Sequence, residues 1–329
     1  MGHRPLMVAA LLGSLSLAAL VSCTGSGGGV SPVSALEGTR SSQPLPALST
    51  PSSVKLGQYL YSASGEAAYE FRLPGLRFCC QFSVYPHCDR TGIKIDRQGN
   101  LYVPDVCTWT VKVYPRGSRA PSFTYTNGIN NPLDVAVARN GNLYVLNHCC
   151  GGDPSQPPEI VFFHPNVASP YNTLPLNDSE IPWGLTLDTD GNLYVTVEAT
   201  FKSVGDVYEL PKGQGAFVDL RLNGLTCPVG DAIDATGDLV VFDPCTQKVS
   251  IYQPGSRNPV RQISKVGDAN GTAGGYIAFT HSGKSLFVAT ATGGSTGNIV
   301  DEIDYASGKV LNTLSPSGAG GGLAVGEGR

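Results

Sequence analysis

Several features that would point to common protein classes are missing from this chain. Beyond the first 22 residues, no stretch shows the 3.6-residue apolar period of an amphipathic helix. The apolar stretch 6–21 has sixteen residues, whereas a membrane-spanning helix needs about 20. The 22 Lys and Arg residues form no cluster and the net charge is −4, so a nucleic-acid-binding face is not expected. P-loops and dinucleotide fingerprints are also absent, and no serine has the strand–turn–helix context of a nucleophile elbow.

The chain does contain a repeated phrase. Gly-Asn-Leu-Tyr-Val begins at Gly99, Gly141 and Gly191, and diverged copies begin at Gly237 and Gly283. These glycines stand 42, 50, 46 and 46 residues apart. A fixed period of this size is typical of repeated supersecondary units that cannot bury their apolar faces alone.

Each phrase predicts a tight β-hairpin. Apolar residues alternate with polar ones before the turn glycine, as in Ile93 and Ile95, and again after it, as in Leu101 and Val103. A period of two places such side chains on one face of a strand. An Asp precedes several of the glycines; Asp can bond the backbone of its own turn, and Gly adopts positive φ at little cost.

Two further strands fit into each repeat, for example 111–114 and 122–125 in the first. Four strands, a period of 40-odd residues and no helices predict a β-propeller. Five units fit between residues 92 and 314, with an unpaired opening strand at 322–325 and later strands near 58–61 and 68–71. We therefore predict an all-β, six-bladed propeller over 53–329, whose closing blade is shared by strands from both chain ends.

The segment 96–105, Asp-Arg-Gln-Gly-Asn-Leu-Tyr-Val-Pro-Asp, resembles the repeats of NHL-repeat propellers, and the resemblance extends over most of 89–329. It implies the six-bladed fold. The wider group of such propellers includes sugar-lactone hydrolases, lyases and pure binding modules, so the resemblance does not choose an activity.

The N-terminus predicts an exported, lipid-anchored protein. Residues 1–22 combine a short basic start with the apolar stretch, as in a signal peptide. The sequence Leu-Val-Ser-Cys that ends at Cys23 resembles the lipobox of bacterial lipoproteins, in which the cysteine is lipidated; the alternative is an ordinary secretory signal with an incidental cysteine. Residues 24–52, rich in Gly, Ser and Pro, predict a flexible tether. We expect a place in the bacterial cell envelope, periplasmic or at the cell surface, and the outer membrane if the host is Gram-negative, because position 24 is not Asp.

Eight cysteines follow Cys23, and an even number in an exported protein predicts disulfides. The repeat register places two pairs at neighbouring ends of antiparallel hairpins, which predicts the disulfides Cys88–Cys107 and Cys227–Cys245. The remaining cysteines are expected to pair among themselves across neighbouring blades: Cys79, Cys80, Cys149 and Cys150. A zinc site is the competing use, although these pairs lack the C-x-x-C spacing of zinc knuckles.

Candidate site residues recur at fixed distances after the turn glycines. Asp105, Asn147 and Asp243 come six residues after them, and His148 and Glu198 come seven after. Trp183 is expected on the same rim. The oxygen donors Asp105, Asn147, Glu198 and Asp243 suit a hard cation such as Ca²⁺, and His148 and Glu198 offer acid–base groups. The alternative is that these residues cap turns, as an Asp at this position typically does in NHL-like repeats.

Two functions follow from this pattern. We favour a non-catalytic binding or scaffold module for a protein, peptide or glycan, since no complete catalytic constellation is present. The alternative is a metal-assisted hydrolase or lyase that resembles the lactonase-type propellers and uses the rim residues. We expect a monomer that contacts the membrane only through its lipid.

Overall fold

The computed structural model describes residues 57–64, 67–83, 91–148, 157–176, 180–199, 205–267, 275–290, 299–314 and 321–327. The predicted signal peptide, Cys23 and the predicted tether at 24–52 all lie outside the described residues. The described part contains only strands and turns, and it holds no helix long and apolar enough to cross a membrane.

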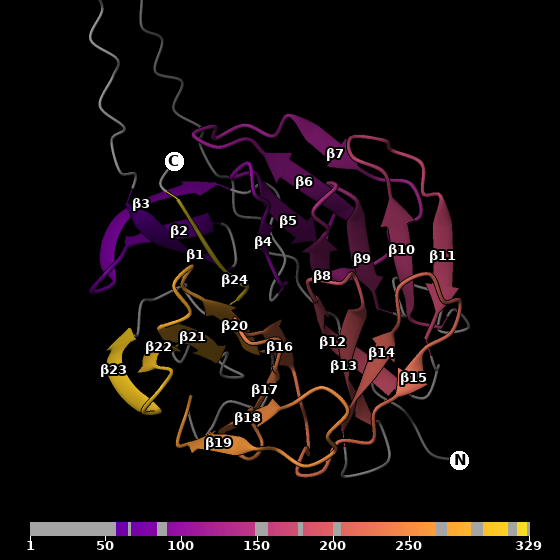
Figure 1. Cartoon of the computed structure of the whole chain (residues 1–329). Helices are drawn as coiled ribbons and strands as arrows, with labels where there is room; N and C mark the ends of the chain where they lie inside the picture. Colours follow the sequence, from indigo (N-terminus) through magenta and orange to yellow (C-terminus); the bar gives the residue numbers. More distant parts are fainter. Residues whose placement is uncertain are drawn as a thin grey trace, which may run out of the picture. The chain divides into compact units, whose positions relative to one another are not determined.

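Six four-stranded antiparallel sheets form a ring, which confirms the predicted six-bladed β-propeller (Figure 1). Blade 1 has β4 (Lys94–Ile95), β5 (Leu101–Asp105), β6 (Thr110–Tyr114) and β7 (Phe123–Tyr125). Blade 2 has β8 (Pro132–Val137), β9 (Leu143–Asn147), β10 (Glu159–Phe163) and β11 (Asn172–Pro175). Blade 3 has β12 (Glu180–Leu187), β13 (Leu193–Ala199), β14 (Asp206–Leu210) and β15 (Val218–Asp219). Blade 4 has β16 (Gly230–Ile233), β17 (Leu239–Asp243), β18 (Lys248–Tyr252) and β19 (Arg261–Ser264). Blade 5 has β20 (Gly275–Phe279), β21 (Ser285–Thr290), β22 (Ile299–Asp304) and β23 (Lys309–Leu314).

The closing blade is built from both ends of the chain. Its order is β24 (Leu323–Glu327), β1 (Gln58–Ser64), β2 (Ala67–Arg72) and β3 (Arg77–Ser83). The C-terminal strand pairs antiparallel with β1, with Leu60 opposite Val325 and Tyr61 opposite Ala324. This pairing leaves no open seam in the ring, which suits a fold that must hide its strand edges.

The repeated phrase is a turn held by its own side chains. In blade 3 the carboxylate of Asp188 accepts hydrogen bonds from the backbone N–H groups of Gly191 at 2.7 Å and Asn192 at 2.9 Å, and Gly191 has φ 97°. The other carboxylate oxygen accepts bonds from Asn192 Nδ2 at 2.7 Å and the Tyr194 hydroxyl at 3.3 Å. Similar bonds surround Asp96 in blade 1. The Asp, Asn and Tyr of the repeat are therefore parts of one turn.

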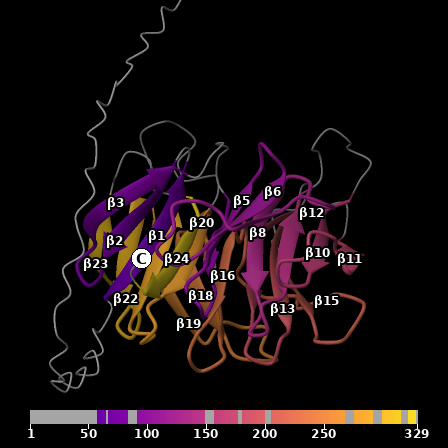
Figure 2. The same ribbon diagram turned by 90° about the horizontal axis from the view of Figure 1, so that it is seen from above.

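The core lies between the blades. In one cluster Tyr102 and Val113 of blade 1 pack against Val135 and Val145 of blade 2. The innermost strand of each blade contacts the innermost strands of its two neighbours, and these six strands surround the ring axis. Figure 2 shows the same sheets standing side by side when the ring is turned by 90°.

Candidate functional site

The predicted rim residues do occupy equivalent places at one end of the blades. Asp105, Asn147 and Asp243 each end the second strand of their blade. Each lies opposite the first residue of the third strand, for example Asp105 opposite Thr110 and Asp243 opposite Lys248. The shared position therefore follows from the repeat, and the contacts of each side chain show what it does there.

The two rim aspartates hold their own loops. Asp105 accepts hydrogen bonds from the backbone N–H groups of Cys107 at 3.0 Å and Thr108 at 3.2 Å, and its other oxygen lies 3.0 Å from the Lys112 ammonium. Both Asp105 and Asp243 are almost completely buried. Hydrogen bonds of this kind offset the cost of burying a carboxylate.

Asp243 and Asn147 tie the second strand to the segment that leads into the first strand of the same blade. Asp243 accepts bonds from the backbone N–H groups of Thr226 at 2.5 Å and Cys227 at 3.3 Å. Asn147 donates to the Gly128 carbonyl at 2.8 Å and accepts from another backbone N–H of that segment. Three of the four side chains proposed as cation ligands, Asp105, Asn147 and Asp243, thus already accept hydrogen bonds from backbone N–H groups.

His148 and Glu198 have partners within their own blades. His148 Nδ1 lies 3.4 Å from Asn131 Nδ2 in blade 2. Glu198 accepts a hydrogen bond from the Trp183 indole at 3.1 Å in blade 3. Both residues are half-buried, and these contacts orient each side chain without joining the two into an acid–base pair.

Within the described residues, three or more possible metal-ligating side chains gather in two places: Glu70, Cys79 and Cys80, and Cys227, Asp243 and Cys245. Neither group joins Asp105 to Asp243. In the second group the two sulfur atoms form the predicted Cys227–Cys245 disulfide, with Cα atoms 5.8 Å apart, so they are not available as thiolate ligands.

The other cysteine predictions have different outcomes. Cys107 is disulfide-bonded, while its predicted partner Cys88 lies outside the described residues, as do Cys149 and Cys150. Cys79 and Cys80 are free thiols, which corrects the prediction that they form disulfides. Burial, together with hydrogen bonding to Cys79 and Glu70, raises the pKa of Cys80 to about 12, so this thiol is protonated at neutral pH.

The ring axis holds a group of polar residues that the repeat pattern did not reveal. Tyr276 on β20 of blade 5 donates a hydrogen bond from its hydroxyl to the carbonyl of Leu133 at 3.2 Å, on β8 of blade 2. These blades face each other across the ring, so the Tyr276 side chain spans the channel. Gly92 makes this packing possible, because a Cβ there would collide with the Asp134 carboxylate and lie 2.8 Å from the Tyr276 ring.

Asp134 links three blades beside Tyr276. It is 1% exposed and accepts hydrogen bonds from the backbone N–H groups of Val135 at 2.8 Å and Leu185 at 2.9 Å. The Lys94 ammonium lies 3.6 Å from its second oxygen. Burial raises the pKa of Asp134, and the charge of Lys94 and the two backbone bonds partly oppose this rise.

Asp231 on β16 is also buried, but its carboxylate has fewer hydrogen-bond partners than that of Asp134. It is 3% exposed, and neither carboxylate oxygen has a hydrogen-bond partner among the described residues. Burial raises its pKa well above the ordinary value, Lys94 opposes the rise, and Asp134 adds to it. A buried carboxyl with no donor is far more stable as the neutral acid. Asp231 stands between Val229 and Ile233, where the alternation of the inner strand predicts an apolar residue, and that is the sequence signal that could have identified it. Asp134 takes an ordinary polar place between Leu133 and Val135, so the sequence carries no such signal for it.

Two pockets among the described residues are lined in part by carboxylates. One of about 240 Å³ lies along the inner strands and is lined by Lys94, Asp231 and apolar residues of β20 and β24. The other, of about 620 Å³, lies between blades 3 and 4 at the glycine-turn end, where Asp188, Glu209 and Arg257 contribute. Desolvation and the charge of Asp188 raise the pKa of Glu209. Because its pKa is raised, the Asp231 carboxyl beside the ring axis can hold a proton. The Tyr276 side chain crosses the same axis.

No family model matches the sequence, and no curated protein matches it either, so the resemblance to NHL repeats stays a prediction. Solved structures do match. A chain from the crystal structure of a nidogen/laminin complex is 17% identical, with a TM-score of 0.63, and the match covers 82% of this chain and 98% of that one. Apo AztD from Citrobacter koseri is 10% identical over 83% of this chain and 99% of its own, with a TM-score of 0.53. A protein of unknown function from Bacteroides caccae is 14% identical over 82% and 98%, with a TM-score of 0.59. At such identities the likeness shows the propeller fold alone.

Proposed function

We propose that this chain is a lipid-anchored, extracytoplasmic binding module that recognises a protein, peptide or glycan at the end of the propeller where Asp105, Asn147 and Asp243 lie. The proposal rests on one observation: each of these three side chains forms hydrogen bonds with the backbone of a loop in its own blade and so fixes that loop. A scaffold that fixes loops at one end is the usual basis for a recognition surface.

The loops at this end vary more than the glycine turns at the other. The connection from β5 to β6 runs only from Asp105 to Thr110, whereas that from β9 to β10 runs from Asn147 to Glu159. Trp109, in the shorter connection, is 43% exposed. Exposed aromatic residues of this kind are enriched at binding surfaces. Variation in length on a constant frame is what we expect of a surface adapted to one ligand.

The comparisons are consistent with a binding role. One structural neighbour comes from a complex between two proteins, nidogen and laminin, and the NHL-like propellers that the repeats resemble include binding modules. The predicted lipobox at Cys23 supports an envelope address. A Cys23→Ser variant should lose incorporation of labelled fatty acid, and unchanged labelling would argue against the anchor.

A photo-crosslinking residue placed in the full chain tests the binding proposal. The probe replaces Trp109 in one variant and Val260 in a matched control. Val260 is also exposed, at 53%. It lies between β18 and β19 of blade 4, at the end of the propeller that carries the glycine turns, away from the proposed surface. Irradiation of cells that produce each variant should give a discrete adduct at position 109 and none at 260. Equal adducts at both positions, or none at either, would contradict the proposed surface.

A further inference from the structure

A β-bulge brings two consecutive thiols to the same side of β3. Glu70 on β2 lies opposite Cys80, but the next residue, Phe71, lies opposite Phe78, so Cys79 is an extra residue in the outer strand. In a regular strand consecutive side chains point to opposite faces. A bulge breaks this alternation, and here the two sulfur atoms lie 3.2 Å apart.

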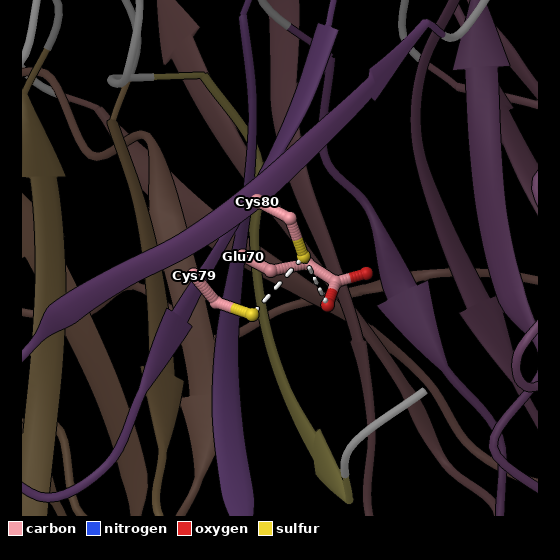
Figure 3. Close-up of side chains that lie close together, drawn as sticks. All are labelled: Glu70, Cys79 and Cys80. Carbon is pink, nitrogen blue, oxygen red and sulfur yellow. Dashed lines mark hydrogen bonds between the residues drawn. The ribbon is translucent and has the colours of Figure 1, made fainter.

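The third member of the group is a carboxylate from the neighbouring strand. Glu70 is 6% exposed, and its Oε2 lies 3.3 Å from the Cys80 sulfur. Among the described residues, the Cys80 thiol is the hydrogen-bond donor to the Glu70 carboxylate. A thiol is a weak donor, so the carboxylate is poorly compensated for its burial. Figure 3 shows both sulfur atoms and the Glu70 carboxylate turned toward one another. Cys79 is exposed and Cys80 half-buried, so the group opens to solvent on one side.

Two thiolate sulfurs and one carboxylate oxygen are a donor set for a borderline-soft metal ion. Tetrahedral Zn²⁺ with Zn–S bonds of about 2.3 Å and a Zn–O bond of about 2.1 Å separates neighbouring ligand atoms by roughly 3.5–3.8 Å. The sulfur–oxygen separation of 3.3 Å is about 0.3 Å shorter than such a site needs, and the sulfur–sulfur separation of 3.2 Å is about 0.6 Å shorter. Rotation of the exposed Cys79 side chain can supply the difference.

We propose that Cys79, Cys80 and Glu70 bind a thiophilic divalent cation, Zn²⁺ or its close analogue Cd²⁺, with the fourth position open to solvent. Binding forms two metal–sulfur bonds and one metal–oxygen bond, and the two thiol protons pass to the solvent. The site is independent of the proposed binding surface, because it lies on the outermost strand pair of the closing blade. The site does not need C-x-x-C spacing. Such spacing normally brings two cysteine sulfur atoms close together, and here the β-bulge does so for two consecutive cysteines.

Cadmium titration of the purified, full-length protein tests this site. The wild-type chain should bind one Cd²⁺ with thiolate-to-metal charge-transfer absorption and the release of two protons. Cys79→Ser and Cys80→Ser should each abolish the absorption, and Glu70→Gln should weaken binding by at least about tenfold. Gln81→Ser, at an exposed position of the same strand, is the matched control and should bind like wild type. The double variant Cys149→Ser, Cys150→Ser should keep the absorption, which excludes those thiols as its source.

The proposal is overturned if Cys79→Ser retains the absorption, or if Glu70→Gln binds as tightly as Gln81→Ser. It is also overturned if the protein as isolated carries Cys79 and Cys80 in a disulfide, with each other or with Cys149 or Cys150. Intact-mass analysis after alkylation measures the number of free thiols and distinguishes these states.

Discussion

Replacing Asp231 with Asn should stabilise the protein at neutral pH and make its stability less dependent on pH. The Asp231 carboxyl is buried beside the ring axis, with no hydrogen-bond partner among the described residues. Its pKa lies well above the ordinary value of 3.8, chiefly because of burial. Asn has the shape of the neutral acid and carries no charge, so the variant keeps the packing and removes the cost of ionisation.

The sign of the effect follows from proton linkage. A carboxyl whose pKa is higher in the folded than in the unfolded chain binds more protons when folded, so it stabilises the fold fully at low pH. The free energy of unfolding then falls as the pH rises from about 3.8 through the folded pKa. Each pH unit within this window lowers it by about 1.4 kcal/mol. The advantage of Asp231→Asn over wild type should therefore grow with pH at this slope and level off above the folded pKa.

Asp134→Asn is the matched control. Both oxygens of Asp134 accept backbone hydrogen bonds, and an amide would turn one of these acceptors into a donor that faces an N–H group. Loss of that bond in a buried site costs about 1–3 kcal/mol, so this variant should be less stable than wild type. Urea unfolding of the full chain between about pH 4 and pH 8 measures both effects. Parallel pH profiles for wild type and Asp231→Asn would refute the reasoning.

Three further variants test the framework. Replacing Cys227 and Cys245 with Ser should lower the free energy of unfolding by about 3 kcal/mol, since the disulfide closes an 18-residue separation; an unchanged urea midpoint would contradict this. Asp243→Ala should cost about 1–3 kcal/mol because it leaves the Thr226 and Cys227 N–H groups without their acceptor, and a neutral effect would mean that water replaces the carboxylate. Tyr276→Phe should cost about 1 kcal/mol, the value of one hydrogen bond across the channel, measured as a fall in Tm.

The repeating parts of the fold are predictable from sequence because their signals are local. A turn such as Asp188–Asn192 contains all of its own hydrogen-bonding groups, so a short phrase determines the hairpin. The closing blade is predictable for a related reason: 322–325 has the pattern of an opening strand with no further strand after it, whereas 58–61 and 68–71 have the pattern of later strands with no opening strand before them. The position of Asp105 and Asp243 at one end follows from the same repeat.

Features that depend on contacts between distant segments, or on a break in the pattern, are not predictable in this way. The sequence pattern does not predict strand β3, because the bulge at Cys79 interrupts the period of two. The role of Asp134 depends on Leu185, which is 51 residues away, and no spacing rule connects them. The repeat predicts that Asp105, Asn147 and Asp243 lie at equivalent strand ends, but their function as loop-holding groups depends on partners such as Thr226 that only the folded chain brings close.

The melting temperature of the full chain in excess calcium and in EDTA tests the central claim most directly. That claim is that the rim carboxylates hold loops and that the protein acts by binding. Asp105 and Asp243 already accept bonds from backbone N–H groups, and Asp105 also pairs with Lys112, so a cation would have to displace these donors. We predict the same melting temperature in both conditions. Calcium at a hundredfold excess over its Kd would add about 2.7 kcal/mol to the free energy of unfolding. A clear upward shift that disappears in Asp105→Asn or Asp243→Asn would contradict the account and favour the metal-assisted enzyme.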